Sequence, residues 1–180
     1  GYSEYLHPLG ENHLLSIGKD TNIENGTTWY LGVQLSLFDI TDFANPKLLH
    51  KELIGVRGTE SEALQNHKAF TFWKEKNLLA LPIALCEYTK PPALARDFGA
   101  MTFIGLYGYR VSLEKGFEPL GRIPTVSNTV NPFPGLPIFY ETWMRGLFIG
   151  DVVFAVQPDS VSSARIDDIS GTVTRITIDN

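Results

Sequence analysis

The sequence has little that a redox or nucleic-acid-binding protein needs. It holds a single cysteine, Cys86, which excludes an intrachain disulfide framework, and we expect that residue to act as a small buried apolar side chain. Charged residues make up only 19% of the chain, with a net charge of −5. Because no basic run occurs, nucleic acids and anionic membranes are poor candidates for partners.

Long apolar runs and known catalytic motifs are also missing. No stretch approaches the ~20 apolar residues of a membrane span, and no signal-peptide pattern opens the chain. The first residue is Gly1 rather than Met, so we expect either a removed leader or a piece of a larger protein. The sequence has no nucleophile elbow, no phosphate-binding loop and no His-Glu-x-x-His motif.

Few residues offer chemistry in the remaining sequence. The four histidines follow no metal-ligand spacing, although His7 and His67 both stand near the start of an expected strand that would line a central channel. We interpret them as hydrogen-bonded residues at strand ends. Asp167 and Asp168 are adjacent, so on a strand they would point to opposite faces and make a poor acid–base pair.

What the chain does contain is a repeat. Apolar segments recur around Leu14, Leu78 and Leu147, which are 64 and 69 residues apart. A period of this length indicates an array of similar units, none of which can bury its apolar face alone.

Each unit is rich in short segments with strand character. Hydrophobic residues make up 43% of the chain, alternation is clear in Val173 to Ile178, and Leu78 to Ala84 is apolar throughout, as in a strand covered on both faces. Pro119 predicts that the last strand of the second unit is an edge strand. The expected strands are Tyr2 to His7, His13 to Ile17, Val33 to Phe38, Lys47 to Ile54, Lys68 to Trp73, Leu78 to Ala84, Ala100 to Tyr107, Phe117 to Ile123, Thr142 to Ile149, Val152 to Gln157, Val161 to Asp167 and Thr172 to Ile178.

The pattern predicts an all-β fold. Four-stranded antiparallel units in series are typical of β-propeller blades, and we place three of them at about residues 1–57, 64–125 and 140–180. The first strand of each unit should lie nearest the ring axis. Helical periodicity is almost absent, and only Thr59 to Glu62, with capping-box spacing, predicts one short helical turn.

Several segments together resemble a known family. The sequence is similar to the β-propeller domain of predicted secreted archaeal and bacterial proteins, a family described as distantly related to WD-repeat propellers. The resemblance implies a propeller at the C-terminal end of a larger exported or cell-surface protein, and no active site. The segments that carry it are Tyr5 to Asp20, Gly32 to Pro46, His67 to Phe70, Lys76 to Leu79, Lys115 to Phe117 and Gly146 to Asp151.

Three blades cannot close a ring of four to eight. An open array would leave apolar blade faces exposed at both ends. We therefore expect protein partners: further blades from the same precursor, another chain, or a second copy that would complete a six-blade ring as a two-fold dimer.

One polar stretch has the composition of a cation site. Asp20, Asn22 and Glu24 place side-chain oxygens at alternate positions before Gly26, as calcium-binding loops do, although the spacing departs from that of an EF-hand. The alternative is an ordinary polar loop. Asn25 begins an Asn-Gly-Thr glycosylation sequon, which is usable only in a secreted protein and is also ordinary turn chemistry.

Long connections are where binding surfaces usually lie. Those at 19–31 and 85–99 occupy equivalent places in the first two units, and we expect both on the same rim of the disc. The proline-rich connector 124–140 should form no regular strand or helix. Its Phe133 and Leu136 are expected to pack on a blade or to contact a partner.

Three classes of function remain. The first is a non-catalytic propeller that serves as a scaffold or binding module of an exported or cell-surface protein. The second is an enzyme whose central-channel site is completed by missing blades. The third is a subunit of an extracellular filament or surface assembly. Since propellers carry unrelated functions on one scaffold, the sequence does not identify a ligand or substrate.

Overall fold

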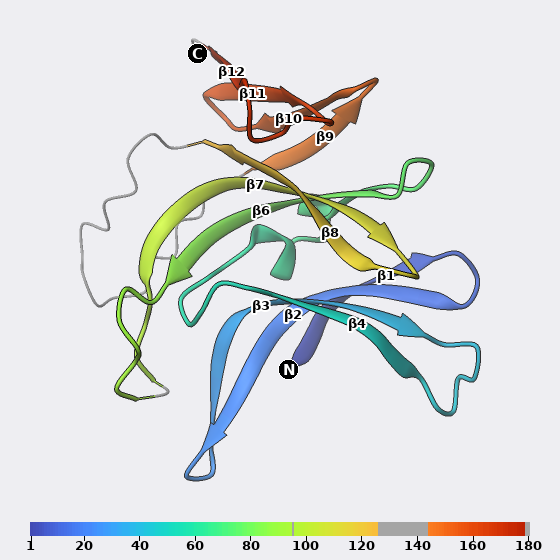
Figure 1. Ribbon diagram of the computed structural model, residues 1–180, viewed down its shortest axis with the longest axis vertical. Helices are drawn as coiled ribbons and strands as arrows, with labels where there is room; N and C mark the ends of the chain where they lie inside the picture. The colour runs from blue at the N-terminus through green and yellow to red at the C-terminus, as the bar shows by residue number, and fades with distance from the viewer. Residues whose placement is uncertain (95, 126–143, 179–180) are drawn as a thin grey trace.

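The computed structural model describes residues 1–94, 96–125 and 144–178, and Figure 1 shows three separate sheets along the chain. Each sheet has four antiparallel strands. The only helices in the described residues are two short 3-10 turns, and neither is long and apolar enough to cross a membrane. The predicted all-β fold with three four-stranded units is therefore confirmed.

The first sheet follows chain order, with the strands β1 (Tyr2–Leu9), β2 (His13–Glu24), β3 (Thr27–Asp39) and β4 (Lys47–Ile54). Alternate residues point to opposite faces of a strand, and Leu15, Ile17, Leu35 and Leu37 all point to one face. These four side chains are fully buried.

The second sheet contains the most deeply buried strand. Its strands are β5 (Thr71–Trp73), β6 (Leu78–Glu87), β7 (Ala100–Ser112) and β8 (Gly116–Pro124), again in chain order. Strand β6 is buried along nearly its whole length, as its continuous apolar run predicts. Pro119 lies in β8, at the edge of the sheet, where its missing N–H breaks no interior ladder.

The third sheet is the smallest. It consists of β9 (Arg145–Ile149), β10 (Val152–Val156), β11 (Ser160–Arg165) and β12 (Thr174–Thr177). Val153 and Ala155 of β10 are fully buried, whereas all four residues of β12 are exposed. One face of this sheet is therefore covered by the rest of the chain, and its last strand is open to solvent.

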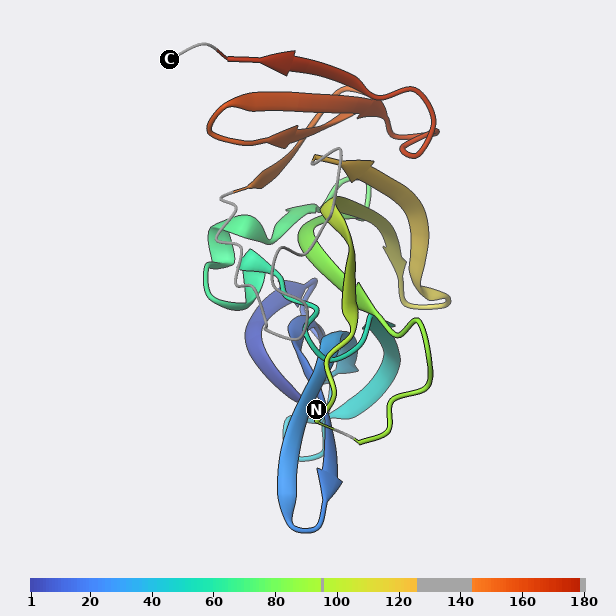
Figure 2. The same cartoon turned by 90° about the vertical axis from the view of Figure 1, so that its left-hand side faces the viewer.

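The three sheets are stacked face to face, with the second in the middle (Figures 1 and 2). One apolar cluster packs Leu15, Leu35 and Leu37 of the first sheet against Leu79 and Leu81 of β6. A fully buried leucine contributes about 1.5–3 kcal/mol to the free energy of folding through burial alone. This cluster therefore holds the first two sheets together.

A second apolar cluster joins the second and third sheets. Leu78 and Ala80, on the other face of β6, pack with Val153 and Ala155. Gly146 of β9 is what permits this close approach, because a Cβ atom there would lie only 2.8 Å from that of Ala80. Strand β6 thus supplies side chains to both clusters.

The first strands of successive sheets lie close together. The rings of Tyr5 and Phe70 are 5.2 Å apart, those of His7 and Phe72 are 5.4 Å apart, and the Thr71 hydroxyl donates a hydrogen bond to the carbonyl of Gly146 at 2.9 Å. Strands β1, β5 and β9 thus approach one another along one side of the stack. This is the arrangement expected if each first strand lies nearest a common axis.

The short helical turn begins later than the sequence predicts. Turn η1 spans Glu62–Leu64, and its cap is Ser61, whose hydroxyl accepts the Ala63 N–H. Thr59 is fully buried instead, and its hydroxyl donates to the carbonyl of Cys86. The predicted Thr59 cap is therefore wrong, because Thr59 has a partner on β6.

The first strand of the second unit is also shorter than predicted. Residues His67–Ala69 form the second 3-10 turn, η2, and only Thr71–Trp73 pair as a strand. The Asn66 side chain accepts the Lys68 N–H and so caps this turn. Local capping thus prevails over the strand preference of the sequence from Lys68 to Phe70.

Candidate functional site

The first wall of the candidate site is a long β-hairpin. Strands β2 and β3 remain paired as far as Glu24 and Thr27, so most of the predicted loop 19–31 is in fact regular sheet. Asn25 and Gly26 form the tip with φ values of 51° and 77°, as a two-residue hairpin turn with both residues left-handed requires. The prediction of a loop was wrong because the polar residues here are the exposed positions of a strand.

The three residues of the predicted calcium site lie on this hairpin. Asp20, Asn22 and Glu24 are at alternate positions of β2, and Asp20 forms an ion pair of 2.8 Å with Lys51 of β4. Alternate residues of a strand are about 6.6 Å apart along its axis, so the backbone does not bring them together as a loop would. No group of three or more His, Cys, Asp or Glu side chains among the described residues is placed to hold a metal. The loop that motivated the calcium hypothesis is absent, and calcium binding stays an untested prediction.

The second wall is the segment 88–99, which follows β6 and whose described residues, 88–94 and 96–99, lie outside any strand, as predicted. The carboxylate of Asp97 accepts the backbone N–H groups of Ala93 and Leu94, both at 2.9 Å. The Tyr88 hydroxyl donates to the carbonyl of Asp97 at 2.9 Å. Hydrogen bonds within the segment thus hold its described residues in place without a helix or strand among them.

Arg57 connects the two walls. Its guanidinium donates to the carbonyl of Tyr30 on the hairpin at 2.9 Å and to the carbonyl of Arg96 in the segment at 3.0 Å. It also lies 5.1 Å from the ring centroid of Trp29 and 4.3 Å from that of Phe98. A cation placed over an aromatic ring is stabilised by the ring quadrupole. The two long excursions are therefore joined on the same side of the molecule, as the sequence predicts.

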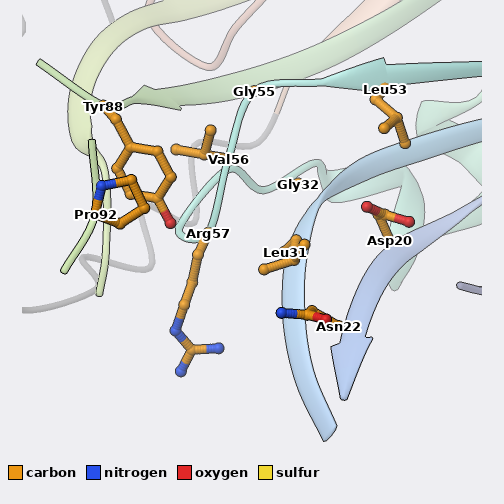
Figure 3. A pocket seen from close by; sticks show the side chains of 10 residues that line it. All are labelled: Asp20, Asn22, Leu31, Gly32, Leu53, Gly55, Val56, Arg57, Tyr88 and Pro92. Atoms are coloured by element: carbon orange, nitrogen blue, oxygen red, sulfur yellow. The ribbon is translucent and has the colours of Figure 1, made fainter. Parts of the chain in front are cut away.

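A cleft of about 310 Å³ lies between the hairpin and the segment. Figure 3 shows Tyr88 and Pro92 on one side of it and Leu31 and Asn22 on the other, with Arg57 between them. The size falls in the range of about 300–1,000 Å³ that is usual for small-ligand sites. The lining residues are Asp20, Asn22, Leu31, Gly32, Leu53, Gly55, Val56, Arg57, Tyr88 and Pro92.

The walls of this cleft are largely apolar, with a few polar side chains among them. Its ten described lining residues include no histidine, cysteine, serine or lysine. Asp20 is held by its ion pair with Lys51, and Arg57 is held by its hydrogen bonds to both walls. Apolar walls with a few fixed polar groups are typical of recognition sites. Sequence reasoning missed Arg57, although its place in the short turn Gly55 to Gly58 after a strand was a usable signal.

Among the residues that the structure describes, no histidine belongs to a cluster placed to hold a metal ion. His7 and His67 both contact the ring of Tyr5, at 6.1 Å and 6.0 Å between ring centroids, so the fold brings them to one cluster. The Tyr5 hydroxyl and His7 Nδ1 are 3.1 Å apart, and burial lowers the pKa of His7. His50 lies elsewhere, with its Nε2 2.9 Å from the carbonyl oxygen of Leu113.

The other residues considered from the sequence have structural roles or lie outside the described part. Cys86 is buried, and burial raises the pKa of its thiol to about 11, so it is not a reactive thiolate at neutral pH. Asp167 forms an ion pair with Arg165 at 2.9 Å, and that contact lowers the pKa of its carboxyl. Phe133 and Leu136, like most of the connector 124–140, lie outside the described residues.

The comparison with protein families agrees with this architecture. A family model described as "Beta propeller domain" matches residues 1–169. The chain belongs to the beta propeller domain family. Its three sheets are therefore propeller blades, with β1, β5 and β9 as the first strand of each blade.

Two archaeal proteins named as uncharacterised are similar to part of this chain. A protein of Archaeoglobus fulgidus is 34% identical over 82 residues, which cover 46% of this chain and 12% of that protein. The uncharacterised protein MJ1554 of Methanocaldococcus jannaschii is 41% identical over 76 residues, or 42% of this chain and 10% of that protein. The matched part thus spans about a tenth of each relative. No solved structure gives a significant match.

Proposed function

We propose that this chain is part of a non-catalytic propeller that serves as a binding scaffold of an exported or cell-surface protein, with the cleft beside Arg57 as its recognition site. The observation that carries this proposal is the pairing of two long excursions from different blades through one guanidinium. Excursions on a rigid scaffold commonly carry binding residues. Here they are held in a fixed relation and border a cavity of ligand size.

Further blades are part of this proposal. The outer face of the third blade carries apolar side chains. Leu147 and Ile149 of β9 point to this face and are 45% and 59% exposed. Ile176 of β12 is 64% exposed. Exposed apolar patches usually mark a surface that another element covers. We infer that a further blade packs on this face as the third blade packs on the second.

The outer face of the first blade has the same character. Leu6, Leu48 and Leu53 are each about half exposed, at 50%, 52% and 49%. The relatives are about ten times longer than the matched region, which supports further blades from the same precursor. A different chain or a second copy of this one would also cover these exposed apolar faces.

The exported location rests on the family resemblance and on one compatible feature. Asn25 lies at the exposed tip of the β2–β3 hairpin, where a glycan would meet no neighbouring blade in the described structure. Glycosylation of Asn25 is therefore a prediction that belongs to the exported location. Mass spectrometry of the protein from its native cells would show the mass of a glycan on that peptide, and an unmodified peptide would contradict glycosylation.

A site-specific photo-crosslinker tests the recognition site. Placed at Asn22 or Pro92 in the cleft, it should give one discrete adduct when the protein is irradiated in its native cells. The same crosslinker at Glu114, in the exposed β7–β8 turn, is the matched control and should give none. Absence of an adduct at both cleft positions, or the same adduct at Glu114, would contradict the assignment of the cleft.

A further inference from the structure

A second cavity lies between the outer strands of the first two blades. It has a volume of about 370 Å³ and is lined from β4 and from the second blade, with one residue of the third. It shares Leu53 and Gly55 with the Arg57 cleft, but its other lining residues differ. The charged and aromatic residues of its lining are Glu52, Glu87, Tyr107, Tyr109 and Arg122.

Glu52 is the unusual member of this cavity. Its side chain on β4 is partly buried between the first two blades, yet no described residue donates a hydrogen bond to it or forms an ion pair with it. Burial raises the pKa of its carboxyl. Glu52 thus presents to the cavity a carboxylate that has no ion-pair partner among the described residues.

Two tyrosine rings line the same cavity. Tyr107 and Tyr109 are stacked at 6.4 Å with an interplanar angle of 30°. Tyr109 is almost fully buried, and its pKa is raised by burial and then by the charge of Glu52. Glu52 and Tyr109 line the same cavity. A carboxylate beside aromatic rings is the usual composition of a site for an organic cation.

The cavity lining also includes one guanidinium, whose printed contacts are with uncharged groups. The Arg122 guanidinium lies 4.8 Å from the ring centroid of Phe103 and 3.3 Å from the Tyr107 hydroxyl, to which it donates. It forms no ion pair with Glu52 or Glu87 in the described structure. Glu87 accepts a hydrogen bond from the Thr102 hydroxyl. Two carboxylates and one guanidinium leave the lining with one net negative charge.

We propose that this cavity binds an organic ammonium group, with Glu52 as its counter-ion and the rings of Tyr107 and Tyr109 as its walls. A divalent metal suits the site less well, because Ca²⁺ takes six to eight oxygen ligands and the cavity offers two carboxylates. An ammonium group instead needs a few acceptors and gains from aromatic faces. The ammonium source is either a free small amine or the lysine side chain of a polypeptide.

Titration by calorimetry tests the proposal with three probes: n-butylammonium, neutral n-butanol and the capped tripeptide acetyl-Gly-Lys-Gly-amide. The ammonium probe should bind saturably and at least about tenfold more tightly than the alcohol, a difference of about 1.4 kcal/mol. Tighter binding of the tripeptide than of butylammonium would identify the source as a polypeptide lysine, and the reverse order as a small amine. Equal binding of butylammonium and butanol, or no saturation, would overturn the proposal.

Glu52→Gln is the informative variant, and Glu118→Gln is its matched control, because Glu118 is also a strand residue but pairs with Lys115 outside the cavity. Glu52→Gln should weaken butylammonium binding at least about tenfold, and Glu118→Gln should leave it unchanged. Equal loss in both variants would indicate general attraction to an acidic protein and overturn the site.

NMR spectroscopy offers a readout that needs no variant. The ring signals of Tyr107 and Tyr109 should shift with butylammonium but not with butanol. Glu52, Tyr107 and Tyr109 do not line the Arg57 cleft. A negative result for ammonium binding would therefore not contradict the proposed recognition site.

Discussion

Lys19 and Glu60 form an ion pair of 2.7 Å that ties the first blade to the second. Lys19 lies on β2 and is only 6% exposed, whereas Glu60 exchanges two backbone hydrogen bonds with Ala84 of β6. The Lys19 ammonium also donates to the carbonyl of Thr59. One buried side chain thus connects a strand of one blade with the segment that leads into the next.

Replacement of this lysine should be costly. In Lys19→Ala the carboxylate of Glu60 and the carbonyl of Thr59 lose their shared donor, so we expect a loss of about 2–3 kcal/mol in the free energy of unfolding, measured by urea denaturation. Lys51→Ala is the control, because Lys51 pairs with Asp20 at the surface and should cost about 0–1 kcal/mol. Equal losses in the two variants would show that Lys19 is not a special link.

Arg57 should determine the mobility of the segment 88–99. Arg57→Lys keeps the charge but loses the planar group that bonds to two carbonyls and stacks on two rings. We expect faster amide hydrogen exchange in this segment and at the tip of the hairpin, with exchange in β6 unchanged. The control is Arg165→Lys, whose exposed pair with Asp167 lies in the third blade. Unchanged exchange in the Arg57 variant would mean that each wall holds its shape alone.

The pH dependence of stability should carry a contribution from His7. Burial lowers the pKa of His7 in the folded state, so the folded chain binds a proton less readily than the unfolded chain does. The corresponding stability is present above the pKa of an ordinary histidine, about 6.5, and is lost as the pH falls through the folded pKa.

The comparison that isolates this effect uses His7→Gln. Between about pH 8 and about pH 5, the wild-type chain should lose more free energy of unfolding than the variant does. His13→Gln, at the exposed end of the first blade, is the control. If the variant and the wild type follow the same pH profile, His7 is not responsible.

Calcium binding by Asp20, Asn22 and Glu24 has a simple test. Because these residues lie along a strand and Asp20 already has a partner, we expect millimolar calcium to leave the melting temperature unchanged. Magnesium at the same concentration controls for ionic strength. A rise in melting temperature with calcium alone, abolished in Asp20→Asn, would instead support calcium binding at these residues.

The order of the strands was accessible from the sequence because it depends on local pattern. The apolar run of Leu78 to Ala84 gave the central strand, and Pro119 gave the edge. The end of β2 and the start of β3 were wrongly predicted as a loop. Strand residues that face solvent on both sides are polar, and their composition therefore resembles that of a loop. The Asn25-Gly26 pair is the feature of the sequence that indicates a hairpin here, because both residues adopt positive φ values.

The candidate sites were less accessible because they depend on contacts between distant residues. Arg57 meets Trp29 and Phe98, and nothing in the sequence around any of the three indicates the other two. The same holds for Glu52, which looks like an ordinary exposed residue of an edge strand until β7 is packed against it. Periodicity predicts which face of a strand is buried, but it does not specify which polar groups meet there.

The central claim is that this chain is part of a propeller whose outer blade faces are covered by other blades. Native mass spectrometry of the protein isolated from its own cells tests it most directly. The account predicts that the 20.1 kDa chain occurs within a longer polypeptide, bound to other chain segments, or as a dimer. A stable free monomer of 20.1 kDa, with Ile149 and Ile176 open to solvent, would contradict it.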